Sequence, residues 1–198
     1  MAITKDPLFH PSHKEIMLFP DDHIYRYWKD LFNTDSRYKT HDLVGLCWNT
    51  KQISPMHPDR SFKLEDISIL SRDKSILFAS FQNGYGSDQL HSSTFKDKFI
   101  SSQDVLSNKR DFPNTVASMK LCKYFITCDT GIAQVACSLG LNTVVIVNDK
   151  PSAPWAGDGE RSYYYKNAFI YRKGREQSWQ EGITELFKYK TLAEIFSS

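Results

Sequence analysis

The chain has 198 residues, of which 40% are hydrophobic, 24% are charged and 14% are aromatic. With 25 basic against 23 acidic side chains, the formal net charge of +2 argues against nucleic acid or an anionic membrane surface as the main partner. No apolar stretch approaches the roughly 20 residues that a membrane-spanning helix needs. The length and the aromatic content predict one globular domain, with room for a short additional arm.

Residues 1–41 differ from the rest of the chain, because they contain four of the six histidines and no clear strand. Asp21-Asp22 is a plausible helix start. One helical face then follows, formed by Ile24, Trp28, Leu31 and Phe32. A single amphipathic helix cannot bury that face alone, so residues 1–41 are predicted to form an N-terminal arm that docks on another element.

Five short apolar runs are expected to form buried strands: 43–48, 76–81, 124–128, 143–147 and 169–171. Strands that are apolar throughout and alternate with helices are typical of a parallel sheet covered on both faces. Residues 42–198 are therefore predicted to form a Rossmann-like α/β domain with a doubly wound parallel sheet flanked by helices. Such sheets bind ligands at the carboxyl ends of the strands, where the strand order reverses.

Several segments between the strands are expected to form helices. A short helix is expected over 64–70, and Asn114 is a candidate N-cap for a helix through Leu121. Asp129-Thr130 precedes a helix that Gly140 is expected to end, and Ser178 to Glu181 reads as a capping box. The stretch 83–110 reads as polar. Among the tryptophans, Trp28 and Trp48 are interpreted as core, whereas Trp155 suits a pocket wall and simple packing equally.

The four cysteines are Cys47, Cys122, Cys128 and Cys137. They form no Cys-x-x-Cys pair, and three of them lie in apolar runs, which indicates buried, reduced thiols and predicts a cytoplasmic protein. The histidines have no spacing with a carboxylate or cysteine that is typical of a metal site, so none is expected.

The most informative segment is the turn at Asp129, Thr130 and Gly131, where a buried strand passes directly into a helix. The free N–H groups of a first helical turn favour an anion, and the Thr130 hydroxyl can donate to a phosphate oxygen. Gly131 has no side chain, so a diphosphate can approach the backbone closely. The alternative is a plain N-cap with a small residue for packing. Asp129→Ala or Thr130→Val is predicted to weaken nucleotide binding more than stability, and equal loss of both would favour the plain cap.

Three further polar turns follow strands or begin helices. They contain Thr50, Arg60 and Ser61 in the loop 49–61, then Gln82 and Asn83, then Asn114 and Thr115. Hydroxyl and cationic groups suit a phosphate, and Gln82 can hydrogen-bond a nucleobase or ribose. Each turn is also explained by a solvated loop or a helix cap when taken alone, but together they favour a ligand that carries phosphate.

The order of these motifs from Val44 to about Phe187 resembles the C-terminal half of a GT-B glycosyltransferase. The closest likeness is to bacterial TPR-containing glycosyltransferases, which are related to heptosyltransferases. The landmarks are Val44 to Trp48, Asp59-Arg60-Ser61, Ser80 to Gly84, Phe112 to Thr115, Asp129-Thr130-Gly131, Leu139-Gly140 and Pro154-Trp155.

The resemblance implies a domain that binds a nucleotide-diphosphate sugar as substrate and needs no cofactor. The helix beginning at Asp129-Thr130-Gly131 would hold the diphosphate, and Thr50, Arg60 and Ser61 would complete its pocket. Gln82 and its neighbours would lie near the nucleotide. The acceptor would lie on a domain absent from this chain or on a second subunit.

Three departures from the family pattern leave a second hypothesis open. Asn83 stands where the family usually has Lys, and Gln134 where it usually has His, so two positive or ionisable groups are missing. Only about 41 residues precede the first strand, too few for an acceptor domain. The alternative is therefore a non-catalytic nucleotide-binding or interaction module on the same scaffold.

Overall fold

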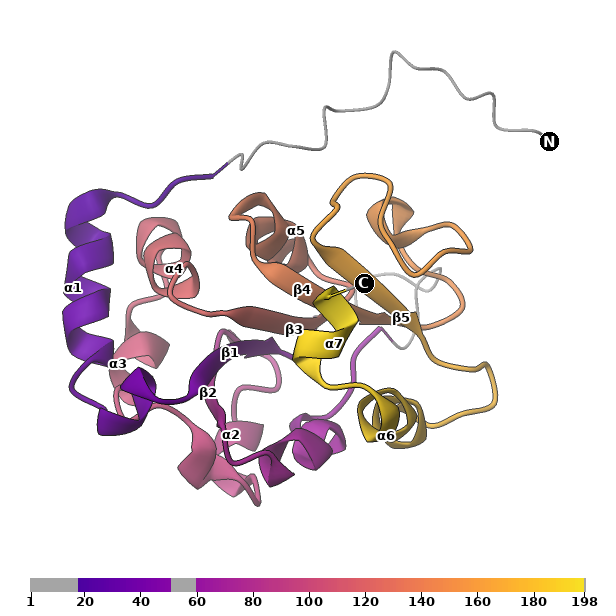
Figure 1. The fold of residues 1–198 in the computed structure, drawn as a ribbon, viewed down its shortest axis with the longest axis horizontal. Coiled ribbons are helices and arrows are strands. Elements are labelled where there is room, and N and C mark those ends of the chain that lie inside the picture. The colour runs from indigo at the N-terminus through magenta and orange to yellow at the C-terminus, as the bar shows by residue number, and fades with distance from the viewer. Residues whose placement is uncertain (1–17, 51–59, 198) are drawn as a thin grey trace, which may run out of the picture.

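The computed structural model describes residues 18–50 and 60–197. Its centre is one parallel sheet of five strands in the order β2-β1-β3-β4-β5 (Figure 1). The strands are β1 (Asp42–Cys47), β2 (Ile76–Ser80), β3 (Tyr124–Cys128), β4 (Asn142–Val147) and β5 (Ala168–Arg172). All four pairings are parallel, which confirms the predicted doubly wound α/β fold.

Helices cover both faces of this sheet. The α-helices are α1 (Asp22–Phe32), α2 (Gln89–Ser92), α3 (Gln103–Asn108), α4 (Phe112–Met119), α5 (Gly131–Ser138), α6 (Trp179–Tyr189) and α7 (Leu192–Phe196). The 3-10 helices are η2 (Ser36–Lys39), η3 (Leu64–Arg72), η4 (Lys96–Lys98) and η5 (Ala153–Trp155). The expected helix at 64–70 is therefore a 3-10 helix. No helix in the described residues has the length and apolar character required to cross a membrane.

Side chains alternate between two large apolar clusters because successive strand residues point to opposite faces. From β1, Val44 and Leu46 enter the cluster that η3, α6 and α7 cover, whereas Leu43 and Cys47 enter the one beneath α1, α3, α4 and α5. Between them, Gly45 admits the ring of Phe125, since a Cβ there would lie 2.4 Å from its Cδ2 atom.

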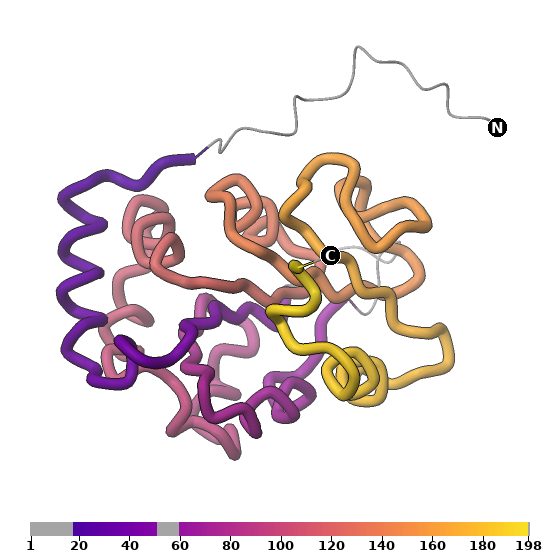
Figure 2. Tube along the Cα trace, in the orientation of Figure 1, coloured from indigo at the N-terminus to yellow at the C-terminus, as the bar shows by residue number. Residues whose placement is uncertain are grey.

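The described part of residues 1–41 packs against the rest of the chain through α1. Asp21 caps α1 by accepting hydrogen bonds from the main-chain N–H groups of His23 and Ile24. Trp28 and Phe32 are fully buried in the cluster that also contains α4 residues. Figure 2 shows α1 running beside α4, about 90 residues away in sequence. Residues 1–17 of the predicted arm lie outside the described part.

One sequence expectation is wrong, and the structure resolves two points that the sequence left open. Asp111, not Asn114, is the N-cap of α4, and its carboxylate accepts from the Asn114 N–H at 2.9 Å. The polar stretch 83–110 contains α2, η4 and α3. It joins the sheet through Gln103, whose amide bonds both the N–H and the carbonyl of Ser80. Trp155 is fully buried, so it packs rather than lining a pocket.

Candidate functional site

The strand order reverses between β1 and β3, because the chain goes from β1 to one side of the sheet and later returns to the other. The carboxyl ends of these two strands lead into Trp48–Thr50 and into Asp129–Gly131. An α/β sheet commonly binds its ligand at such a reversal. The fold thus brings two of the predicted turns to one edge of the sheet: the loop after β1 and the turn at Asp129–Gly131.

The loop after β1 is closed at its base. The Thr50 N–H donates to the Ser61 hydroxyl at 3.0 Å, and the Phe62 N–H donates to the Trp48 carbonyl at 3.0 Å. Arg60, directly before Ser61, is half-buried. Three predicted site residues, Thr50, Arg60 and Ser61, therefore lie at the neck of this loop. Residues 51–59 lie outside the described part.

Gln82 joins the ends of β1 and β2. Its Oε1 accepts from the N–H groups of Trp48 and Asn49 at 3.0 and 2.9 Å. Its Nε2 donates to the carbonyls of Asn49 and Tyr85 at 3.0 and 2.7 Å. Because the side chain is 2% exposed and both amide hydrogens have acceptors, Gln82 holds two loops in place. Asn83, the next residue, is exposed.

The floor of this edge lies between β1 and β3. The Cys47 thiol contacts Gln82 Oε1 at 3.4 Å, and the hydroxyls of Thr127 and Thr130 lie 3.1 Å apart. Burial raises the pKa of Cys47 to about 11. The thiol therefore stays protonated at neutral pH and is a structural group rather than a nucleophile.

The carboxylate of Asp129 turns away from the helix it was expected to cap. It is buried and accepts from the Ser152 N–H at 2.7 Å and from the Ser152 hydroxyl at 2.6 Å. The N-cap of α5 is Thr130, which makes no side-chain capping bond. Asp129 therefore ties the end of β3 to the loop after β4.

The first turn of α5 is open to solvent. Gly131 is exposed, and a Cβ built on it would meet no atom within 4 Å. The early N–H groups of a helix have no intrahelical acceptor, and the helix dipole adds positive potential there. Gln134, one turn along, is also exposed. This end of α5 can accept an anion without rearrangement of side chains.

A pocket of about 230 Å³ lies at the same edge of the sheet. Its lining residues are Ser80, Phe81, Asn83, Leu106, Lys109, Arg110, Phe112, Thr115 and Ile132. Two predicted site residues, Asn83 and Thr115, are among them. Asn114 is not, because its Oδ1 accepts from the Trp28 indole N–H at 2.8 Å and its Nδ2 donates to Asp111.

Sequence reasoning missed the cations of this pocket, Lys109 and Arg110. They belong to the stretch 83–110, which has no apolar periodicity to place it. A signal was available, because both residues come directly before Asp111, which can cap a helix. Residues that lead into a helix at this edge of the sheet face the ligand side. No group of three or more metal-ligating side chains occurs within residues 18–50 and 60–197.

No family model matches the chain, and no curated protein matches its sequence. Solved structures do match its fold. E. coli ADP-heptose LPS heptosyltransferase II superposes with a TM-score of 0.58 at 15% identity, covering 86% of this chain and 52% of that one. A family 9 glycosyl transferase from Veillonella parvula gives 0.54 at 14% identity, covering 89% and 48%.

A third structure, E. coli heptosyltransferase WaaC with ADP-2-deoxy-2-fluoro heptose, gives a TM-score of 0.51 at 12% identity, covering 83% of this chain and 47% of that one. The likeness in all three cases is one of fold. The chain spans about half the length of each of these three structures.

Proposed function

We propose that this chain binds a nucleotide-diphosphate sugar and serves as the donor-binding part of a GT-B-type glycosyltransferase. The observation that carries the proposal is the open N-terminus of α5 at the strand-order reversal, where Gly131 leaves the backbone accessible. The acceptor would be held by another domain or by a second subunit, since the chain spans about half of each matching structure.

The predicted residues divide into two roles under this proposal. Thr130, Gly131 and Gln134 would face the diphosphate from α5, with Arg60, Thr50 and Ser61 at the neck of the opposite loop. Asn83 and Thr115 would line the adjoining pocket. Gln82, Asp129 and Asn114 are supporting residues, because their polar atoms are bonded within the chain.

The site residues suit a leaving group that gains charge. As the glycosidic bond to the diphosphate breaks, negative charge collects on the departing phosphate oxygens. Fixed main-chain N–H groups and cations stabilise such charge without reorganising, and this electrostatic contribution is often the largest in catalysis. The names of two matching structures include ADP-heptose or an ADP-heptose analogue, which supports a nucleoside diphosphate as the leaving group.

A second candidate is a binding module without transferase activity. It is favoured by the exposed, neutral side chains of Asn83 and Gln134 and by the engagement of Asp129 with Ser152, which leaves that buried carboxylate no role as a base. This candidate predicts nucleotide binding without sugar transfer when the chain is mixed with acceptor domains.

The first experiment is a thermal-shift screen with UDP, GDP, ADP, CMP and their sugar conjugates. A ligand that binds only the folded state stabilises it by about 2.7 kcal/mol at a hundredfold excess over Kd. We expect one nucleoside diphosphate to raise Tm selectively. A cooperative melt that no nucleotide shifts at millimolar concentration would contradict the proposal.

A further inference from the structure

Two adjacent cations, Lys109 and Arg110, line the pocket between α3, α4 and α5. They belong to the connection from α3 to α4 and are not part of the phosphate site described above. Asn83 and Thr115 line the same pocket and carry no charge. The pocket therefore presents positive charge together with groups that can donate hydrogen bonds.

Arg110 is half-buried, and its guanidinium donates to the main-chain carbonyls of Gln82 and Ser107. Within residues 18–50 and 60–197, no carboxylate lies within ion-pair distance of it. Burial lowers its pKa. Removing a charge from water is costly unless an opposite charge compensates it. The described residues provide hydrogen-bond acceptors for Arg110 but no counter-charge.

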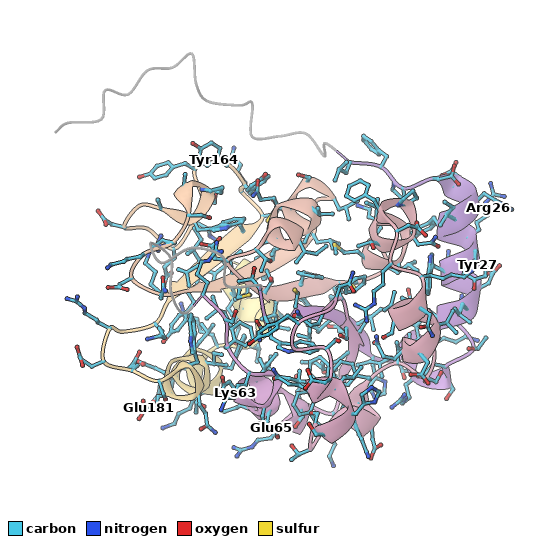
Figure 3. All side chains as sticks on the ribbon, turned by 180° about the vertical axis from the view of Figure 1, so that it is seen from behind. Arg26, Tyr27, Lys63, Glu65, Tyr164 and Glu181 are labelled. Atoms are coloured by element: carbon cyan, nitrogen blue, oxygen red, sulfur yellow. The ribbon has the colours of Figure 1, made fainter. Side chains whose placement is uncertain are left out.

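Lys109 lines this pocket, is exposed and contacts α1. Its ammonium lies 4.1 Å from the centre of the Tyr27 ring, and Figure 3 shows Tyr27 on α1 at the edge of the molecule. The pKa of the nearby Asp111 is lowered mainly by its hydrogen bonds with Asn114, and Lys109 also lowers it. Both Asp111 oxygens accept from Asn114 at 2.8–2.9 Å.

Arg110 lies beside the floor of the main site, because its guanidinium donates to the main-chain carbonyl of Gln82. Gln82 in turn contacts the Cys47 thiol at 3.4 Å, and the pocket that Arg110 lines is also lined by Ile132 in the first turn of α5. The Arg110 charge therefore lies on the same side of the sheet edge as the first turn of α5. Lys109 extends that positive charge toward solvent.

We propose that Lys109 and Arg110 form an anion subsite that takes phosphate oxygens of the donor, with Tyr27 as the positioning residue of Lys109. This inference rests on the proposed donor-binding function, and it identifies the cations that would bind the phosphate oxygens of the donor. Charge on the departing diphosphate would then be stabilised from two directions, by the N–H groups of α5 and by the α3–α4 connection.

The test measures binding by calorimetry for the wild type, Lys109→Met and Arg110→Gln. The probes are inorganic pyrophosphate, the nucleoside diphosphate that gives the largest thermal shift, and its uncharged nucleoside. We expect each variant to bind both charged probes about tenfold more weakly, which is about 1.4 kcal/mol, and the nucleoside with unchanged affinity. A purely structural defect would weaken all three probes together.

The matched control is Lys188→Met, because Lys188 also lies over a tyrosine ring, at 5.1 Å from the centre of Tyr189, in α6. It removes the same charge and the same kind of contact elsewhere, and it should leave all affinities unchanged. If Arg110→Gln melts early, Arg110→Lys retains the charge and should restore pyrophosphate binding.

The outcomes separate the two proposals. Wild-type affinity for nucleoside diphosphate and pyrophosphate in both variants would overturn the anion subsite and leave donor binding standing. A wild type that binds no nucleotide, yet binds pyrophosphate through Lys109 and Arg110, would overturn donor binding and retain the subsite.

Discussion

Two layers of the same sheet edge contain motif residues with opposite properties. The lower layer is the floor, formed by Cys47, Gln82, Thr127 and Asp129, all buried and hydrogen-bonded within the chain. The upper layer is the rim, formed by Asn83, Thr115, Gly131 and Gln134, which are exposed or half-buried.

The two layers alternate along the sequence. Gln82 is followed directly by Asn83, and Asp129 precedes Gly131 by two positions. A residue at the end of a strand still packs against its neighbours, whereas a residue one or two positions further lies in the turn and is exposed to solvent. A polar residue in a motif of this kind therefore supports the site or contacts the ligand depending on one or two positions in the chain.

The largest effect is expected from Gln82→Leu in the floor. It leaves the N–H groups of Trp48 and Asn49 without their acceptor, and each unsatisfied buried group costs about 1–3 kcal/mol. We expect a loss of roughly 3 kcal/mol in the free energy of unfolding, measured by urea denaturation. The neighbouring rim variant Asn83→Ala should change it by less than about 0.5 kcal/mol. Equal losses in the two variants would remove the distinction between floor and rim.

The next largest effect is expected from Asp129→Ala. The sequence alone predicts that this change weakens nucleotide binding more than stability, but the buried bonds to Ser152 reverse that order. Hydrogen bonds to charged groups contribute about 1.5–3 kcal/mol, and we expect a loss of stability in that range. Ser152→Ala removes only the hydroxyl and should cost less. A nucleotide affinity that falls in Asp129→Ala with unchanged stability would return Asp129 to the ligand-binding residues.

Gly131→Ala tests the rim. The added methyl group meets nothing in the chain, and alanine favours a helix over glycine, so Tm should hold or rise slightly. The methyl group would occupy the space where a phosphate approaches, so we expect nucleotide Kd to rise about tenfold, which is about 1.4 kcal/mol. Gly159→Ala is the matched control, because its nearest atom is at 3.9 Å and it lies outside the site. Unchanged affinity in Gly131→Ala would exclude close approach to the backbone.

The smallest effect at neutral pH is expected from the floor thiol. Burial raises the pKa of Cys47 to about 11, so the unfolded thiol ionises first as the pH rises. The stability that the protonated thiol contributes is present below the unfolded pKa, about 8.5, and is lost as the pH rises toward the folded value. Urea denaturation of wild type and Cys47→Ala at pH 8 and pH 10.5 should show a smaller pH effect in the variant. Chemical labelling of the Cys47 thiol in the folded protein at pH 8 would contradict this account.

Much of the fold could be predicted because its signals are local. The strands are continuous apolar runs, and β3 and β4 were placed to within one residue of their ends. Local signals also placed α1, through Asp21 and its helical apolar face, and α6, through the capping box of Ser178 and Glu181. Each of these depends on residues a few positions apart, so the chain specifies them before it folds.

The stretch 83–110 could not be predicted in the same way. Its helices are short and half-polar, and they are held by contacts from elsewhere, such as Gln103 on Ser80 and the Ile100 N–H on the Phe78 carbonyl. As a result, Lys109 and Arg110 were absent from the predicted site, although they line the pocket that contains Asn83 and Thr115.

The sequence by itself determined the α/β class, the order of the strands along the chain and the edge at which polar turns gather. Tertiary structure alone decided which polar group in each turn is free. Asn114 is bonded to Trp28 from α1, and Asp129 to Ser152 from the loop after β4, over 86 and 23 positions in sequence. A hydrogen bond between distant segments leaves no local pattern, because the partner is chosen by the packing of the sheet and its helices rather than by spacing along the chain.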